Sequence, residues 1–329
     1  MTFACRRSFL AGALAGLLLP VGAGCAAQAA APADAPPVAP APERPRFSFG
    51  VVADVQYADK AGGGRRYRDS LAKAARCVEA WNREDLAFAV DLGDLTDDRP
   101  DGGTKADLDR ILGAFRPLKA PLRHVLGNHG PPSAGRVAVL DALGMERPYY
   151  DFASDGWRFV VLDGTGLHLK AWPADSARRA ASEAYWRERR GEGRPELAEY
   201  NGGIDPDQLA WLRDVLARAA AAREPVGVFC HLPVLAAAST RSHLLWNHEE
   251  VLAAIDACPT LAAWIAGHDH RGGTAARNGV HHVTLEGMVE TAADGNAFGV
   301  VDVFPGRLEI RGSGAMTSRR LEIRGDVTR

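Results

Sequence analysis

The sequence is poor in cysteine and has almost no excess of charge of either sign. Among its 329 residues are 5 cysteines, and those beyond the N-terminal segment, Cys77, Cys230 and Cys258, have no paired spacing. Neither a disulfide scaffold nor a zinc knuckle is therefore expected, and we interpret each of the three as a small buried hydrophobe. The formal net charge of −2 argues against a general binder of long nucleic acids, because such proteins usually carry a strong basic excess.

The N-terminal segment lacks an apolar run long enough to span a bilayer comfortably. Residues 10–21 are apolar, but they are too few for a transmembrane helix and follow the pair Arg6-Arg7. We expect residues 1–30 to be an export signal similar to twin-arginine signals, so that the mature chain is periplasmic with no stable membrane span. Lipidation of Cys25 is a weaker alternative, because a glycine stands where a lipoprotein signal has a bulky aliphatic residue. A mis-assigned start codon or a plain membrane anchor would also account for this segment.

Composition divides the rest of the chain into a linker and one large domain. Residues 31–45 are mostly alanine and proline, which favours extended backbone and cannot pack a core. The chain has 47% hydrophobic and 24% charged residues and no internal repeat, so we expect residues 46–329 to form one globular domain. Residues 165–203 are polar and weakly patterned, and we interpret them as an insertion near the functional site rather than as a second domain.

Strand-like runs alternate with helix-like periodicity along this domain. The run 47–54 is followed by apolar residues at helical spacing over 71–81 and by the run 86–90, which together predict a β-α-β unit. A helix over 105–115 and a strand over 122–126 repeat the pattern, and three further β-runs are expected towards the C-terminus. The sequence therefore predicts an α/β fold.

Several of the predicted strands stop just before a residue of a type that binds metal ions. The carboxyl ends of strands in an α/β sheet converge on one edge, where loops gather side chains that are distant in the sequence. Taken one at a time, each of these residues also has an ordinary interpretation as a helix cap, a turn residue or a buried histidine. Together they predict a binding site formed by Asp54, Asp94, Asn128, His231 and His268.

The motif Gly267-His268-Asp269-His270 is the most specific of these features. Two alternate histidines bring their imidazoles near one point only where a glycine lets the backbone turn sharply. Other histidines lack such a context, and we interpret them as structural: His124, His168, His243, His248 and His281.

The order and spacing of these residues resemble the signature of the calcineurin-like metallophosphoesterases. The matching motifs are Asp54-x-Gln56, Gly93-Asp94-x-x-Asp97, Gly127-Asn128-His129, His231 and Gly267-His268-x-His270. A closer resemblance is to the manganese-dependent ADP-ribose/CDP-alcohol diphosphatase branch, and it is carried by residues 53–59, 81–82, 124–129, 267–273 and 279–291. The likeness extends from about residue 47 to the final strands.

This resemblance implies two stacked mixed β-sheets flanked by helices, a four-layer sandwich with a two-metal site at the strand ends. By position, it implies one metal ion bound by Asp54, Gln56, Asp94 and His270, and a second bound by Asp94, Asn128, His231 and His268. Asp94 bridges the two ions in this arrangement. The resemblance also implies that His129 is not a ligand and donates a proton to the leaving-group oxygen.

The implied ligands suit two divalent cations. Carboxylates, carboxamides and imidazoles bind Mn²⁺, Fe²⁺ or Zn²⁺ without any thiolate. Most of the wider superfamily has histidine where this chain has Gln56, and a carboxamide oxygen is a harder donor, which favours Mn²⁺. Asp97 is expected either to orient a ligand or to stabilise a turn. The next basic segment has two interpretations. It contacts the phosphate or the base of the substrate, or it is a solvated basic turn; its residues are Arg65, Arg66 and Arg68.

One loop departs from the pattern of the superfamily. After Gly127-Asn128-His129 the superfamily usually has an acidic residue and the diphosphatase branch has aromatic residues, whereas this chain continues with Gly130-Pro131-Pro132-Ser133. This change bears on the leaving-group pocket and on substrate preference. It touches none of the implied metal ligands.

The predicted function is hydrolysis of the phosphoanhydride in nucleoside diphosphate-linked small molecules, such as ADP-ribose or a CDP-alcohol. The alternative is a periplasmic phosphodiesterase or phosphomonoesterase that acts on cyclic nucleotides or lipid head-group phosphodiesters, because an exported enzyme meets few cytoplasmic substrates. A binding protein without catalysis is disfavoured, since every implied ligand position and His129 are filled. The expected partner is thus a small nucleotide-type phosphate, and the oligomeric state is left open.

Overall fold

The computed structural model describes residues 43–324 of the chain, so the predicted export signal and most of the predicted linker lie outside the described residues. The described α-helices are α1 (Ser70–Trp81), α2 (Thr104–Phe115), α3 (Pro131–Ala134), α4 (Arg136–Leu143), α5 (Ala177–Arg189), α6 (Pro206–Ala222) and α7 (His248–Asp256). The described 3-10 turns are η1 (Arg190–Glu192), η2 (Pro195–Leu197), η3 (Ala236–Ala238), η4 (Arg241–His243) and η5 (Met288–Glu290). The described strands are β1 (Phe47–Val52), β2 (Phe88–Asp91), β3 (Leu122–His124), β4 (Tyr150–Ser154), β5 (Trp157–Leu162), β6 (Val226–Cys230), β7 (Leu261–Ala266), β8 (Arg271–Arg277), β9 (Val280–Glu286), β10 (Ala297–Phe304), β11 (Arg307–Gly314) and β12 (Arg319–Glu322).

These strands form two mixed sheets of 6 strands each. In the first sheet, ordered β12-β11-β10-β1-β2-β3, strands β1, β2 and β3 are parallel, and β10 runs antiparallel to β1. In the second, ordered β4-β5-β6-β7-β9-β8, the inner strands are parallel and the edge strands β4 and β8 are antiparallel to their neighbours. Each sheet therefore gathers the carboxyl ends of several parallel strands at one edge.

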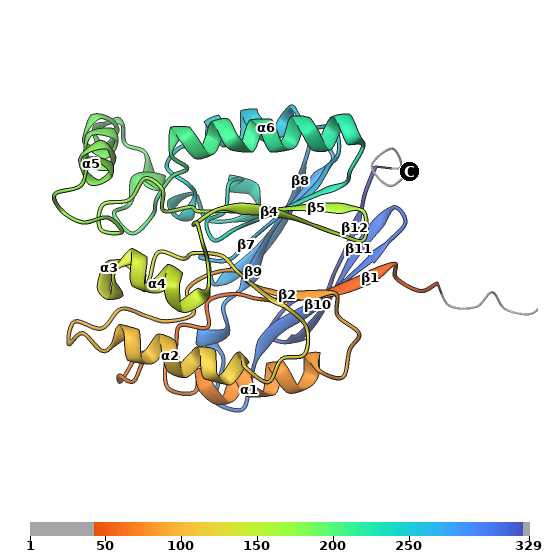
Figure 1. Cartoon of the computed structure of the whole chain (residues 1–329), viewed down its shortest axis with the longest axis horizontal. Helices are drawn as coiled ribbons and strands as arrows, with labels where there is room; N and C mark the ends of the chain where they lie inside the picture. The colour runs from red at the N-terminus through yellow and green to blue at the C-terminus, as the bar shows by residue number, and fades with distance from the viewer. Residues whose placement is uncertain (1–42, 325–329) are drawn as a thin grey trace, which may run out of the picture. The chain divides into compact units, whose positions relative to one another are not determined.

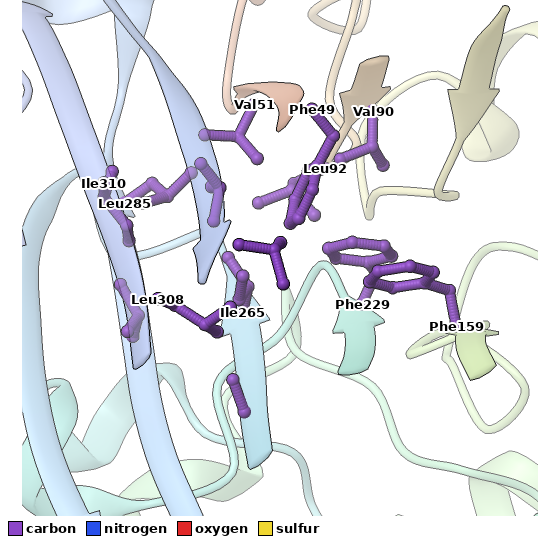
Figure 2. Packing of buried hydrophobic residues seen from close by; sticks show 14 of the residues in the cluster. Phe49, Val51, Val90, Leu92, Phe159, Phe229, Ile265, Leu285, Leu308 and Ile310 are labelled. Carbon is purple, nitrogen blue, oxygen red and sulfur yellow. The ribbon is translucent and has the colours of Figure 1, made fainter. Parts of the chain in front are cut away.

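The two sheets face each other across an apolar layer. Figure 2 shows Phe49 and Val90 of the first sheet in this layer together with Phe159, Phe229 and Ile265 of the second. The rings of Phe159 and Phe229 stack with their centroids 5.5 Å apart, and Phe49 meets both rings edge-on. Burial of one such side chain stabilises a fold by about 1.5–3 kcal/mol. The aromatic cluster therefore holds the sheets together.

Helices cover the outer face of each sheet. Helices α1 and α2 pack on the first sheet and α6 packs on the second, on opposite sides in Figure 1. The alternation of side chains along β1 explains this arrangement, because Phe49 and Val51 enter the layer between the sheets while Gly50 and Val52 face the helices. Gly50 lets Trp81 of α1 approach the strand, since a Cβ there would lie 2.7 Å from the indole ring. The predicted four-layer α/β sandwich is confirmed.

The predicted elements agree with the structure except at the C-terminal strands, in the segment after His129 and within residues 165–203, where helix α5 was not predicted. After residue 270 there are five strands, β8 to β12, rather than the three expected. Strands β8 and β12 lie at sheet edges and are largely exposed, so they carry little hydrophobic pattern and are defined by pairing with β9 and β11. The short helices α3 and α4, which follow His129, were also not predicted.

Further expectations concern the cysteines and the membrane. Cys77, Cys230 and Cys258 are free and buried, which confirms their interpretation as small core residues. Within residues 43–324, no helix is both long and apolar enough to cross a bilayer. The segment 165–203 contains α5, η1 and η2, and its leucines Leu167 and Leu197 pack with Trp246.

Candidate functional site

The predicted site residues follow parallel strands of both sheets. Asp54, Gln56, Asp94 and Asn128 come after β1, β2 and β3 of the first sheet, and His231, His268 and His270 come after β6 and β7 of the second. Oδ1 of Asp54 lies 3.1 Å from Nε2 of His270 and 4.0 Å from Nε2 of His231. Asp94, His231 and His268 are buried and offer ligand atoms that all lie within 4.8 Å of one another. The carboxyl ends of the parallel strands of both sheets therefore meet at one point.

Much of this site is built on strained backbone. Asp54, Gln56, Asp94 and His268 have φ angles of 53°, 43°, 56° and 69°, in the left-handed region that favours glycine. Such conformations cost about 1–3 kcal/mol each and persist only where the surrounding structure fixes them. Their concentration here marks these turns as functional rather than as ordinary connections.

Two glycines let the backbone of one motif reach the carboxylate of another. A Cβ at Gly127 would overlap Oδ1 of Asp94, and a Cβ at Gly267 would lie 2.6 Å from Oδ2 of Asp54. The backbone N–H of His129 donates to Oδ1 of Asp94 at 2.8 Å, and that of His268 donates to Oδ2 of Asp54 at 2.9 Å. One oxygen of each carboxylate is thus held by backbone, and the other faces the imidazoles.

Hydrogen bonds behind the imidazoles determine which ring nitrogen faces the centre. Nδ1 of His231 lies 2.8 Å from the carbonyl oxygen of Leu92, and Nδ1 of His270 lies 2.7 Å from Oε1 of Glu290. A carbonyl and a carboxylate only accept, so both Nδ1 atoms must carry the proton. Nε2 of each ring is therefore the nitrogen that faces the carboxylates.

Acceptor atoms consequently face one another across the site. Nε2 of His231 lies 2.9 Å from Oδ1 of Asn128 and 3.2 Å from Oδ2 of Asp94, while Nε2 of His270 lies 3.1 Å from Oδ1 of Asp54. A positive charge belongs at each of these contacts, supplied either by a second ring proton or by a metal cation. A buried set of carboxylate, carboxamide and imidazole donors fits a divalent transition metal.

The charges of the site favour a cation there. Burial disfavours the protonated ring of His231, but the Asp94 carboxylate outweighs it and raises the pKa of His231. Burial likewise opposes protonation of His270, and Asp54 outweighs it and raises the pKa of His270 to about 9. Burial alone would raise the pKa of Asp94, yet His231 holds that pKa well below its usual range. His268 differs, because burial and the nearby His231 lower its pKa well below the ordinary value.

Gln56 lies between the two sets of donors. Its Nε2 is 3.3 Å from Oδ2 of Asp94 and 3.3 Å from Nε2 of His270, and Arg65 donates to its Oε1 at 3.0 Å. The amide thus turns its nitrogen inward, whereas metal ligation uses the oxygen. Rotation of the carboxamide by a half-turn would exchange Nε2 and Oε1, which are similar in size. The oxygen would then face Asp94 and His270, and the hydrogen bond from Arg65 would be lost.

The match to known proteins covers most of the described chain. A family profile described as calcineurin-like phosphoesterase matches residues 47–272. The chain belongs to the calcineurin-like phosphoesterase family. The resemblance inferred from the motifs is therefore confirmed, and the chain is a hydrolase of the metallophosphoesterase type.

Similar proteins define the branch of this family. The manganese-dependent ADP-ribose/CDP-alcohol diphosphatase of Oryza sativa subsp. japonica is 34% identical over 302 residues, which are 84% of this chain and 94% of that protein. The protein of the same name from Homo sapiens is 31% identical over 313 residues, 83% of this chain and 92% of that protein. The crystal structure of a dimetal phosphatase from Danio rerio has a TM-score of 0.79 and 29% identity, and the match covers 85% of this chain and 100% of that chain.

In this phosphoesterase, carboxylates from the loop after β2 surround His129. Its Nδ1 lies 3.1 Å from Oδ1 of Asp97 and 3.1 Å from Oδ2 of Asp98, and the backbone N–H of Gly130 donates to Oδ1 of Asp98 at 3.1 Å. Burial opposes protonation of the ring, but Asp94 and these two carboxylates outweigh it and raise the pKa of His129 well above its ordinary value. Asp98 thus supplies a carboxylate beside His129, although the loop that follows His129 has none.

A pocket with a volume of about 390 Å³ opens over the site, and two of its lining residues were not predicted. Tyr200, from the segment 165–203, is 45% exposed and donates its hydroxyl to the carbonyl oxygen of Ser242 at 3.1 Å. Its ring centroid lies 5.6 Å from that of His243. His243, interpreted from the sequence as structural, therefore lines the pocket. Only its place in the fold reveals this, because no motif surrounds it.

The basic segment after β1 is divided between the site and the surface. Arg65 lines the pocket and pairs with Glu290 at 3.2 Å and Asp97 at 3.8 Å. Arg68 instead pairs with the exposed Asp59 at 2.8 Å. Of the two interpretations left open by the sequence, the structure therefore favours a site role for Arg65 and a surface role for Arg68.

Proposed function

We propose that this phosphoesterase hydrolyses the phosphoanhydride bond of nucleoside diphosphate-linked small molecules, such as ADP-ribose or a CDP-alcohol. The observation that carries the proposal is the buried cluster in which acceptor atoms of Asp54, Asp94 and Asn128 face those of histidines. The names of the relatives from Oryza sativa and Homo sapiens support this substrate class. The predicted export of the chain falls on residues outside those described and stays a prediction.

We further propose that two divalent cations, Mn²⁺ by preference and Fe²⁺ or Zn²⁺ as alternatives, bind in this cluster. One set of ligands is Asp54, Gln56, Asp94 and His270, and the other is Asp94, Asn128, His231 and His268. Bound there, such cations supply Lewis-acid catalysis, because they offset the charge of the phosphate and make a water molecule more acidic. The dimetal character of the similar protein from Danio rerio supports the number of ions.

His129 is proposed as the proton donor to the leaving oxygen. Its Nδ1 is held by Asp97 and Asp98, so Nε2 is the nitrogen left for a substrate in the pocket. The carboxylates that raise its pKa keep the ring protonated near neutral pH, as an acid requires. General acid catalysis of this kind typically contributes about 10²–10⁴-fold to the rate.

The pocket supports a small nucleotide as the substrate. Its volume of about 390 Å³ falls within the range of small-molecule sites, roughly 300–1,000 Å³. Arg65 offers a guanidinium that suits a phosphate group, while Tyr200 and His243 offer ring surfaces that suit a base or sugar. The wall of the pocket therefore matches a molecule with a charged centre and a flat end.

A substrate panel tests this function directly. The full chain is assayed with ADP-ribose, a CDP-alcohol, a nucleoside monophosphate and bis(p-nitrophenyl) phosphate, in Mn²⁺, in Zn²⁺ and with a chelator. We expect the nucleotide diphosphates to be the best substrates, Mn²⁺ to give the highest rate and the chelator to abolish turnover. Preference for the bis-aryl diester would refute the substrate class, and full activity with Zn²⁺ alone would refute the preference for Mn²⁺.

A matched pair of substitutions tests the placement of the site. Asp94→Asn removes a buried charge that faces His231, so we expect it to abolish turnover. Asp109→Asn makes the same chemical change on the exposed face of α2, where Asp109 pairs only with Lys105 among the contacts of the described chain, and activity should be unchanged. Retained turnover in Asp94→Asn would show that the site is placed wrongly.

A further inference from the structure

Asn201 is buried directly behind one of the proposed metal ligands. Its exposed fraction is 0%, and its Oδ1 lies 2.7 Å from Nε2 of His268. Its Nδ2 donates to the carbonyl oxygens of Glu196 at 2.9 Å and Ser242 at 2.7 Å. Because a carbonyl oxygen only accepts, the amide nitrogen must face these two groups, and the amide oxygen must therefore face the histidine.

This fixed orientation selects one form of the His268 ring. An amide oxygen accepts and never donates, so Nε2 of His268 must carry a proton. In the neutral ring the lone pair is then on Nδ1. The arrangement is the reverse of that at His231 and His270, where Nδ1 carries the proton and Nε2 faces the carboxylates.

We propose that Asn201 is a positioning residue of the metal centre, which holds His268 with Nε2 protonated so that Nδ1 serves as the ligand atom. This inference rests on the proposed function of the site. Without an acceptor at this place the neutral ring would adopt either tautomer and rotate more freely. Loss of such an outer hydrogen bond typically weakens metal binding by about 10–100-fold.

The same amide also ties the ligand to the wall of the pocket. The carbonyl oxygen of Ser242 accepts hydrogen bonds from Nδ2 of Asn201 and from the hydroxyl of Tyr200. Ser242 lies in η4, which ends at His243. Asn201 therefore joins His268 to both aromatic residues of the wall, and its segment, 165–203, contributes to the metal centre as well as to the pocket.

Asn247 provides a matched control for a buried amide without contact to the site. It is 3% exposed, and both hydrogen bonds of its side chain are with Ile204: Oδ1 accepts from the backbone N–H at 3.0 Å, and Nδ2 donates to the carbonyl oxygen at 2.8 Å. Asn247→Leu thus removes the same kind of bridge from a neighbouring loop. It should lower stability while leaving the metal centre as it is.

The test compares Mn²⁺ binding by full-length Asn201→Leu, Asn201→Asp and Asn247→Leu, using electron paramagnetic resonance and calorimetric titration, with thermal unfolding of each metal-free protein. We expect Asn201→Leu to weaken the binding of one of the two Mn²⁺ ions by about 10–100-fold. Asn201→Asp keeps an acceptor for His268 but loses the two hydrogen bonds to Glu196 and Ser242, so it should be less stable than the wild type and still bind Mn²⁺ more tightly than Asn201→Leu. Asn247→Leu should lower only the melting temperature. Unchanged Mn²⁺ binding in Asn201→Leu, or an equal loss in Asn247→Leu, would overturn the proposal.

A measurement on the wild type keeps the inference testable if a variant does not fold. Long-range ¹H–¹⁵N correlation spectra of the metal-free protein report which nitrogen of each neutral imidazole carries the proton. We expect the proton of His268 on Nε2, and a proton on Nδ1 would refute the role of Asn201. Wild-type protein that shows this tautomer but binds no Mn²⁺ would contradict the proposed function and leave the positioning of His268 intact.

Discussion

Substitution of Gly127 by alanine tests the close packing that brings the motifs of this phosphoesterase together. A Cβ at this position would overlap Oδ1 and the backbone nitrogen of Asp94 and would lie 2.7 Å from its Cγ. The carboxylate cannot give way freely, because the backbone N–H of His129 holds the same Oδ1 at 2.8 Å. The added methyl group must therefore displace either the carboxylate or the ends of the strands.

The cost of either displacement follows from the contacts that are lost. Moving the carboxylate away loses a hydrogen bond to a charged group, which contributes about 1.5–3 kcal/mol. Separating the strand ends to admit a methyl group costs about 1–3 kcal/mol through overpacking. We therefore expect Gly127→Ala to lower the free energy of unfolding by roughly 1–3 kcal/mol, whichever displacement occurs, and to weaken Mn²⁺ binding.

Gly113, on the exposed side of α2, is the matched control. A Cβ there meets nothing within 4 Å, so Gly113→Ala should raise the free energy of unfolding by about 0.5–1 kcal/mol through the higher helix propensity of alanine. Urea denaturation of the metal-free proteins, followed by Mn²⁺ titration, measures both effects. A Gly127→Ala protein as stable as the wild type and with unaltered Mn²⁺ affinity would refute the packing described for the site.

Two further substitutions probe proton donation and acid stability. His129→Gln should lower turnover by about 10²–10⁴-fold for substrates with poor leaving groups, and much less for p-nitrophenyl esters, while Mn²⁺ binding is unchanged; an equal loss with every leaving group would count against its role as the acid. His282 has no hydrogen-bond partner on either ring nitrogen within the described chain, and burial lowers its pKa from 6.5 to about 4. The unfolded chain therefore binds a proton at His282 more readily than the folded chain does. The contribution of His282 to the free energy of unfolding is thus fully present above pH 6.5 and is lost as the pH falls towards 4. His282→Leu should make this decline shallower in urea denaturation at pH 7.5 and pH 5, and an unaltered decline would contradict the assignment.

The sequence by itself determined the buried strands and the residues at their ends. Runs such as 47–53 are almost continuously apolar because both faces of an inner strand are covered, and that pattern is visible without a structure. Asp54, Asp94 and His231 stand just beyond such runs, and parallel strands bring their carboxyl ends together. That these side chains gather at one place was therefore predictable for the group, although no single residue in it was decisive.

Only the tertiary structure decided which atoms of these residues face the centre. The acceptors behind His231, His268 and His270 are a backbone carbonyl, a carboxamide and a carboxylate from three distant segments. No pattern along the chain singles out such partners, because a hydrogen bond depends on where two segments lie in space and not on their spacing in the sequence. For the same reason Asn201, which has no recognisable motif around it, could be found only after the loops had been placed over the strand ends.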